Sequence, residues 1–234
     1  MVSERLMVHH GRDRMQIGRW KSRSDIANFV PFPSGDTLPL DAVRHATVQA
    51  VSAGFREAYT AALAPSQAAP FVASGFELHE ELHLLRCHIT AEPERERTAT
   101  RRGRKQDWPS VLELDHLAFD DFWQFDREGL ADAIAATPRH RFHVTKAEPV
   151  AGYHVTGLGG RNAYVQRVAV HPEAQGQGWG RRLVNDSLWW SWRHGATTSL
   201  VNTQLTNDRA VALYERCGFA LATDRLQVLH ARLA

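Results

Sequence analysis

Three glycines at alternate positions, Gly176, Gly178 and Gly180, constrain this chain more than any other feature of its sequence. They lie in the segment HPEAQGQGWGRRLVNDSL, just before a stretch with the spacing of a helix. Glycine inside a helix costs about 1 kcal/mol relative to alanine, so a cluster at the start of one needs a reason. The first turn of a helix leaves about four backbone N–H groups without partners and carries about half a positive charge. Glycines there let an anion approach the main chain, so the segment predicts an anion-binding turn.

Two other glycine-rich phosphate motifs do not fit these residues. A dinucleotide-binding G-x-G-x-x-G that starts at the first glycine requires a glycine where the chain has Arg181, and the Gly-Lys-Ser/Thr of a nucleoside-triphosphate loop is absent. The pattern that fits is Gln/Arg-x-x-Gly-x-Gly, with Gln175, Gly178 and Gly180, between a strand that ends RVAVHP and a helix that begins RRLV. Arg181 and Arg182 lie where the helix dipole disfavours cations, so a bound anion would relieve a cost.

The surrounding residues alternate between strand and helix patterns. Residues 110–125 have helical spacing after Ser110, and the runs RFHVTKA, VAGYHVTGL and NAYVQRVAV predict three strands. A helix is expected from Gly178 to His194, followed by the strand SLVNTQL and the helix DRAVALYERC. The C-terminal ALATDRLQVLHARLA predicts two more strands. This order predicts a mixed α/β domain.

A second motif, NDRAVALYERCGF, places Asn207 at the start of a helix and Tyr214 two turns later on the same face. Together with the glycine loop it resembles the GNAT superfamily of N-acetyltransferases, in order, over residues 98–234. The resemblance implies a mixed, mostly antiparallel sheet flanked by helices, with acetyl-CoA as cofactor. It assigns the pyrophosphate to the loop and the pantetheine arm to the strand before it. The residues implied for the cofactor are Val168, Ala169, Val170, Gln175, Gly176, Gln177, Gly178, Trp179, Gly180, Arg181 and Asn207.

The same resemblance implies a catalytic role for Tyr214, whose hydroxyl would protonate the departing thiolate of the coenzyme. A phenol with a pKa of about 10 is matched to a thiol of about 8.5. Acetyl would pass directly to a neutral amine, with the N–H of Val170 polarising the carbonyl. The base stays open: Asn202 stands where enzymes that acetylate protein N-termini have a glutamate, and His154, Tyr164 or a water chain are the alternatives. The expected acceptor is an amine, a small molecule or a peptide.

The first half of the chain contains a weaker copy of the second. Residues 53–89 can be aligned with residues 194–233, with Gly75-Phe76 on Gly218-Phe219, and the preceding helices also match. Chance similarity between two helix-strand units is the alternative explanation. The copy has no glycine cluster, so we expect the chemistry in the second half.

The charged segment of residues 90–109 is poor in large apolar side chains and predicts a solvated connection. We therefore expect two domains, a degenerate GNAT-like domain over residues 1–96 and an acetyltransferase domain over residues 97–234.

Two further interpretations stay open beside the enzyme. One is a non-catalytic acyl-CoA sensor or scaffold that binds a partner through the N-terminal half. The other is a zinc hydrolase, because His79 to His83 has the formal H-E-x-x-H spacing. That motif binds zinc on a helix, whereas the leucines here alternate at period two and predict a strand, so no metal is expected.

Bulk properties exclude some classes of partner. A formal charge of +2 and a pI near 8.7 fall short of the clustered basic face of a nucleic-acid binder. Two cysteines make no disulfide framework, and no apolar run reaches the eighteen residues of a membrane span, so a cytoplasmic protein is expected. Three tryptophans follow the glycine loop, and one at an interface would allow a homodimer.

Overall fold

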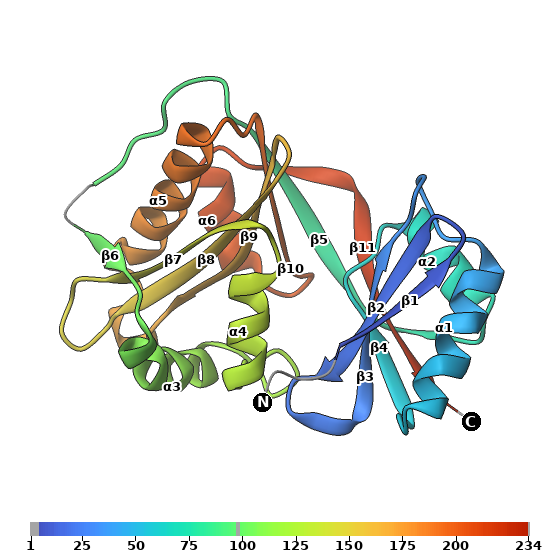
Figure 1. The fold of residues 1–234 in the computed structure, drawn as a ribbon. Helices are drawn as coiled ribbons and strands as arrows, with labels where there is room; N and C mark the ends of the chain where they lie inside the picture. Colours follow the sequence, from blue (N-terminus) through green and yellow to red (C-terminus); the bar gives the residue numbers. More distant parts are fainter. Residues whose placement is uncertain (1–4, 97–98, 234) are drawn as a thin grey trace. The chain divides into compact units, whose positions relative to one another are not determined.

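The structure, a computed structural model, describes residues 5–96 and 99–233. In that part of the chain, eleven strands and six α-helices form two compact units (Figure 1). Unit 1 comprises Met1–His83 and Thr223–Ala234, and unit 2 comprises Leu84–Ala222. Mostly antiparallel strands flanked by helices confirm the predicted fold class.

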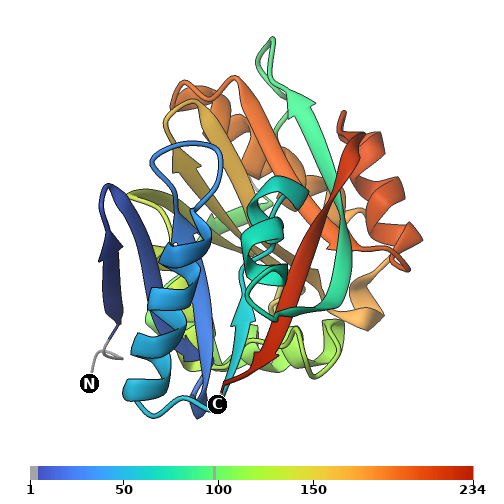
Figure 2. The same ribbon diagram turned by 90° about the vertical axis from the view of Figure 1, so that its right-hand side faces the viewer.

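Unit 1 is a sheet with helices on one face. Its elements are β1 (Leu6–His10), β2 (Asp13–Trp20), β3 (Arg23–Phe32), α1 (Leu40–Ser52), β4 (Glu57–Thr60), α2 (Pro65–Val72), the first part of β5 (Glu77–His88) and most of β11 (Ala220–Arg232). Strands β1 to β3 pair antiparallel, β3 pairs parallel with β4, and β4 pairs antiparallel with β11. Helices α1 and α2 cover the same face of this sheet (Figure 2), where Phe29, Val43 and Phe71 form the centre of its core.

Unit 2 is a sheet between two layers of helices. Its elements are part of β5 (Glu77–His88), β6 (Thr100–Arg102), α3 (Trp108–Ala118), α4 (Arg127–Ala135), β7 (Arg139–Thr145), β8 (Gly152–Gly159), β9 (Asn162–Val170), α5 (Trp179–Arg193), β10 (Thr198–Gln204) and α6 (Asp208–Arg216), with two short 3-10 turns, Lys105–Asp107 and Pro172–Ala174. The strands lie in the order β5-β10-β9-β8-β7-β6. Strands β6 to β9 pair antiparallel, and β10 is parallel to β9.

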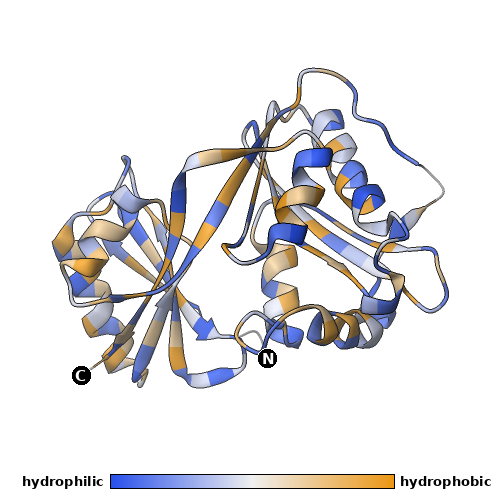
Figure 3. Ribbon diagram, turned by 180° about the vertical axis from the view of Figure 1, so that it is seen from behind, coloured by the Kyte–Doolittle hydropathy of each residue, from blue (hydrophilic) through white to orange (hydrophobic). Residues whose placement is uncertain are grey.

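Each face of the unit 2 sheet has its own core. Helices α5 and α6 bury Val184, Leu188 and Tyr214 on one face, and α3 and α4 bury Leu114 and Leu130 on the other. Hydrophobic and hydrophilic residues alternate along the strands (Figure 3), as expected where successive side chains point to opposite faces. The functional site is therefore built on a sheet fixed from both sides.

The internal copy predicted from the sequence is present in the order of the elements. Helix α1, strand β4, helix α2 and strand β5 repeat as α5, β10, α6 and β11. In both copies a glycine of positive φ follows each helix. Gly54 (92°) follows α1 and Gly195 (82°) follows α5, and Gly75 (92°) follows α2 and Gly218 (87°) follows α6. The repeated order of elements, together with these turns, agrees with an internal copy.

The two units are interleaved along the sequence, which differs from the boundary expected at residue 96. Strand β5 contributes residues 84–88 to unit 2, and β11 returns to pair with β4 of unit 1. The expected start of the second domain, residue 97, lies outside the described residues. The segment before it is also less solvated than predicted, because Arg95 forms a 2.6 Å ion pair with the buried Asp186.

Two predicted elements were wrong in detail. The single strand β11 replaces the two expected C-terminal strands, since its polar middle remains extended and Arg225 pairs with Glu81 of β5 at 3.1 Å. The helix expected over residues 110–125 is α3, which begins at Trp108 without a Ser110 cap and ends at Ala118. It ends there because the chain folds back, and the carboxylate of Asp115 accepts the N–H of Phe125 at 2.6 Å.

Candidate functional site

The three glycines of the loop before α5 meet two different requirements, positive φ and a close approach between helices. Gly176 and Gly178 have φ values of 80° and 82°, a region that costs other residues about 1–2 kcal/mol. Gly178 is the N-cap of α5 and offers no side chain to cap it. Gly180 lies in the first turn, where a Cβ would come within 2.9 Å of the Cδ2 of Leu213 on α6. The third glycine therefore allows α5 and α6 to approach each other.

The loop leaves a continuous row of backbone donors. None of the N–H groups of residues 176–181 has a hydrogen-bond acceptor among the described residues, and the first that does is that of Arg182, to the oxygen of Gly178 at 3.2 Å. Arg182 itself is turned to Glu96 at 2.7 Å. Six unpartnered donors at a helix N-terminus form a site for an anion.

Strands β9 and β10 separate beside this loop. In the described part of the chain they pair only where Asn162–Tyr164 lies against Thr198–Leu200, so the later half of β9 has no strand partner there on that side. The N–H of His171 donates to Ala151 on the β8 side at 2.9 Å, whereas the oxygen of Val170 accepts the Gln175 side chain at 3.1 Å on the other side. Because successive residues of a strand direct their polar groups to alternate edges, the N–H groups of Val168 and Val170 point into the gap.

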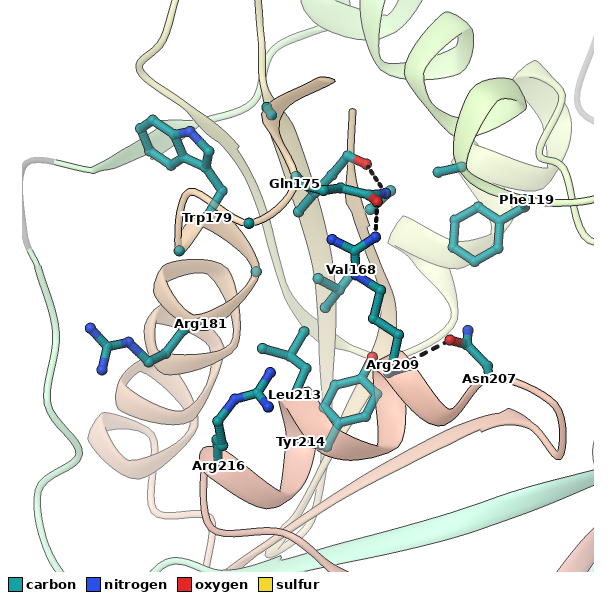
Figure 4. Close-up of a pocket in the computed structure, with 18 residues that line it drawn as sticks. Phe119, Val168, Gln175, Trp179, Arg181, Asn207, Arg209, Leu213, Tyr214 and Arg216 are labelled. Atoms are coloured by element: carbon teal, nitrogen blue, oxygen red, sulfur yellow. Dashed lines mark hydrogen bonds between the residues drawn. The ribbon is translucent and has the colours of Figure 1, made fainter. Parts of the chain in front are cut away.

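A cavity of about 500 Å³ opens between this gap, the loop and α6 (Figure 4). Arg181, Arg209 and Arg216 give it positive charge, and no carboxylate is found among the described residues that line it. All of the residues predicted for the cofactor and for catalysis lie on its wall except Gln177, whose side chain donates to the oxygen of Glu173 at 3.1 Å. The lining residues are Ala118, Phe119, Val168, Ala169, Val170, Ala174, Gln175, Gly176, Gly178, Trp179, Gly180, Arg181, Asn207, Arg209, Ala210, Leu213, Tyr214 and Arg216.

Helix α6 brings Asn207 and Tyr214 to the same wall of the cavity. The Asn207 side chain accepts the N–H of Ala210 at 3.1 Å, so it caps α6 as its position predicts. Tyr214 is only 6% exposed, and burial raises the pKa of its hydroxyl. The phenol therefore stays protonated at neutral pH and can act only as a donor of that proton.

Sequence reasoning missed two parts of the wall. Arg209, in the first turn of α6, hydrogen-bonds through its guanidinium to the side-chain oxygen of Gln175. Its place in the NDRA run next to Asn207 was the available signal. Ala118 and Phe119 come from the end of α3, a position that no motif marks and that only the fold-back after Asp115 creates.

Neither His154 nor Tyr164, the two side chains considered as the base, lines the cavity. His154 is completely buried, with Nε2 3.0 Å from Asp186 and Nδ1 2.9 Å from Thr156. Tyr164 is 38% exposed on the paired part of β9 and does not line the cavity. Asn202 is exposed on β10 and does not line it either.

His154 instead belongs to a buried ion network around Asp186 of α5. Arg95 and Arg141 pair with its carboxylate at 2.6 and 2.7 Å, and His143 lies 3.3 Å away. Burial alone would raise the pKa of Asp186, but hydrogen bonds from His154 and Arg141 outweigh it and keep that pKa below its usual value. His143, His154 and Asp186 are close enough to share a metal ion. Because two guanidinium groups already neutralise the carboxylate, the network is explained as structural.

A second buried network supports the wall near Phe119. Arg167 of β9 makes two 2.7 Å hydrogen bonds to Asp115, which also accepts the Tyr153 hydroxyl. The guanidinium lies between two rings, 3.4 Å from the centroid of Phe119 and 4.0 Å from that of Phe125. The network connects β8, β9 and the residues that follow α3.

The H-E-x-x-H segment lies on β5, which confirms the predicted strand. In the described residues, no helix has both the length and the apolar character that crossing a bilayer requires.

The sequence and the fold both match known proteins. The family model of the acetyltransferase (GNAT) family matches residues 108–219, which include the loop, the gap between β9 and β10 and helix α6. The chain carries a GNAT acetyltransferase domain. Proteins of this family generally use acyl-CoA, and typically are N-acetyltransferases. No curated protein matches the sequence at a significant level.

Solved structures of GNAT proteins match almost the entire chain. A tandem GNAT protein from the clavulanic acid biosynthesis pathway, without AcCoA, has a TM-score of 0.68 and 16% identity, with 97% of this chain and 82% of that one covered. A putative GNAT acetyltransferase from Novosphingobium aromaticivorans has a TM-score of 0.63 and 16% identity, with 98% and 92% covered. A GCN5-related N-acetyltransferase from Kribbella flavida has a TM-score of 0.63 and 13% identity, with 97% and 89% covered. At these identities the likeness shows the fold alone.

Proposed function

We propose that this protein is an acetyl-CoA-dependent N-acetyltransferase that moves acetyl from the thioester directly to a primary amine of a small molecule or a peptide. The observation that carries the proposal is the row of six unpartnered N–H groups at residues 176–181, which opens on a cationic cavity with Tyr214 in its wall. Coenzyme A is a polyanion with a diphosphate, and such a group fits donors of this kind.

The chain's residues suit the two ends of such a ligand. The loop amides and Arg181 would hold the diphosphate, and the free edge of β9 would pair with an amide-containing arm. A second hollow of about 450 Å³ lies beside the first turn of α5, but Glu94 and Glu96 line it together with its arginines, so it offers no clear site for a further phosphate. The residues at the loop and at the gap therefore fit the diphosphate and the amide-containing arm of acetyl-CoA.

The reacting end would lie between Val170 and Tyr214. Bound there, acetyl-CoA supplies the thioester whose C–S bond breaks as the C–N bond to the amine forms. The N–H of Val170, directed into the gap, would donate to the carbonyl oxygen and stabilise the negative charge that develops on it. The Tyr214 hydroxyl would give its proton to the departing sulfur, and the amine must lose one proton to solvent or to a base.

The test is a pair of measurements on the purified chain. Calorimetry with coenzyme A is expected to show binding. Incubation with acetyl-CoA and an amine library is expected to release free thiol and to give a product in which an acetyl group replaces one hydrogen of the amine, as mass spectrometry would show. A Gly178→Asp variant is the matched control, because it adds a negative charge at the donors and should abolish binding. Absence of heat with coenzyme A for folded native protein would overturn the proposal.

One observation favours a second function. Among the described residues that line the cavity, none is a histidine, aspartate or glutamate that could deprotonate an amine. A non-catalytic acyl-CoA sensor needs the loop and the gap but no base. Tight binding of coenzyme A without thiol release for any amine would favour the sensor over the enzyme.

A further inference from the structure

The cavity has a polar end and an apolar end. The polar end is the loop, with its free N–H groups and Arg181. Figure 4 shows Phe119 on the opposite side of the cavity from Trp179 of that loop. On the Phe119 side the wall is made of small or apolar side chains, Ala118, Phe119 and Val168. A ligand whose diphosphate occupies the loop therefore extends towards an apolar wall.

Phe119 is held in place more firmly than an ordinary surface aromatic residue. Its ring lies 3.4 Å from the guanidinium carbon of Arg167, a cation–π contact. Arg167 is 7% exposed and cannot move away, because it makes two hydrogen bonds to the fully buried Asp115 and a third to the oxygen of Trp123 at 2.7 Å. A ring fixed in this way excludes a ligand atom instead of yielding to it.

We propose that Phe119 sets the size of the acyl group, so that the cavity admits acetyl and excludes longer acyl groups. The inference rests on the proposed function and names the acyl-donor class of the same site. Phe119 acts here as a specificity-determining residue, since it bounds the space beside the thioester and takes no part in proton transfer.

The experiment is calorimetry with a series of ligands: coenzyme A, acetyl-CoA, butyryl-CoA and hexanoyl-CoA. No amine is added, so the thioesters stay intact. For native protein we expect hexanoyl-CoA to bind at least about tenfold more weakly than acetyl-CoA, the size of effect that an overfilled pocket produces. In Phe119→Ala the ratio of hexanoyl-CoA to acetyl-CoA dissociation constants should fall to within about threefold, because the removed ring leaves room for the chain.

Phe125→Ala is the matched control. It removes the other ring from Arg167, 4.0 Å away, but Phe125 does not line the cavity. This variant should therefore keep the native ratio. Phe119→Trp tests the same wall in the opposite direction and is expected to weaken acetyl-CoA more than coenzyme A. It keeps the proposal falsifiable if the alanine variant does not fold, as judged by circular dichroism.

The outcomes separate the two proposals. Equal affinity for all thioesters in native protein, or a Phe119→Ala ratio equal to that of Phe125→Ala, overturns the role of Phe119 and leaves the proposed function in place. Absence of binding by coenzyme A itself overturns both.

Discussion

Two buried tyrosines show how differently one side chain can be used. Tyr153 is a completely buried residue of β8, and its hydroxyl donates to Asp115 and is committed to structure. Tyr214 is nearly as buried, yet its hydroxyl has no hydrogen-bond partner in the part of the chain that the structure describes. A hydroxyl at the wall of a cavity without a protein partner is free to donate to a ligand.

Replacing Tyr214 by phenylalanine tests this role. Tyr214→Phe removes the proton donor but keeps the ring that packs at 5.6 Å on Phe219. If the proton is given to the departing thiolate, kcat falls by about 10²-fold or more while the affinity for coenzyme A changes little. Steady-state thiol release and calorimetry on the same preparation measure the two quantities. Unchanged kcat would contradict the assignment.

The histidines beside Asp186 predict how stability depends on pH. Burial, followed by repulsion from Arg141, lowers the pKa of His143 from 6.5 to about 3. Below pH 6.5 the unfolded chain therefore takes up a proton that the native chain does not, so stability is lost as the pH falls from 6.5 towards 3. One such histidine costs about 2 kcal/mol between pH 7 and pH 5.

In His143→Gln this loss should be smaller by about 2 kcal/mol. Glutamine can still hydrogen-bond Thr100, which lies 3.1 Å from Nδ1 of His143. Urea unfolding at pH 7, 6 and 5 gives the free energies. His140→Gln, an exposed site on the same strand, is the control and should lose as much stability as the native protein. An equal loss in both variants would contradict the prediction.

Helix α5 has a glycine of the same backbone conformation near each of its ends. Gly178 is its N-cap and Gly195 follows its C-cap residue, His194, and both glycines have a φ of 82°. The residues differ in surroundings, since Gly178 lies on the cavity wall and Gly195 does not. The element therefore offers a matched pair in which backbone strain is equal and only the ligand site differs.

Gly178→Ala and Gly195→Ala should each lower the free energy of unfolding by about 1–2 kcal/mol, because both force an L-residue to positive φ. Only Gly178→Ala is expected to weaken coenzyme A as well, by about tenfold, because the strained turn shifts the amides of residues 176–181. Chemical denaturation and calorimetry measure the two effects. Equal affinities in the two variants would show that the loop does not hold the ligand.

At the scale of the whole molecule, the two units share strands that the sequence assigns to one half each. Leu85 and Ile89, from the end of β5 and just beyond it, are buried in the core of unit 2 with Leu188 of α5. In the opposite sense, Leu229 and Ala231 of β11 are buried in the core of unit 1. Neither core is complete in a chain divided at residue 96.

A chain of residues 97–234 should therefore be less stable than one of residues 84–222. The segment of residues 97–234 lacks Leu85 and Ile89, whose burial stabilises the core by about 2 kcal/mol each. It also exposes the apolar residues of β11. A free energy of unfolding lower by about 4 kcal/mol would consume much of the stability of an ordinary domain. Thermal unfolding of the two fragments measures the difference, and equal midpoints would support the boundary at residue 96.

The sequence alone determined the loop, the helix that follows it and the helix of Tyr214. These depend on local rules: glycine supplies positive φ, an asparagine caps a helix, and an apolar face repeats every three or four residues. The same rules identified the repeated helix-strand pairs before Gly75 and Gly218, and they placed His79 on a strand.

Only the tertiary structure decided which residues far apart in sequence share a site. Phe119 reaches the cavity because Asp115 binds Arg167 and Phe125, and His154 is excluded because Asp186 of α5 encloses it. The pairings of Asp115 with Arg167 and of His154 with Asp186 join groups more than thirty residues apart, and their geometry depends on how entire elements pack. Local propensity carries no information about them, since the free energy of such a contact arises only once both partners have left water.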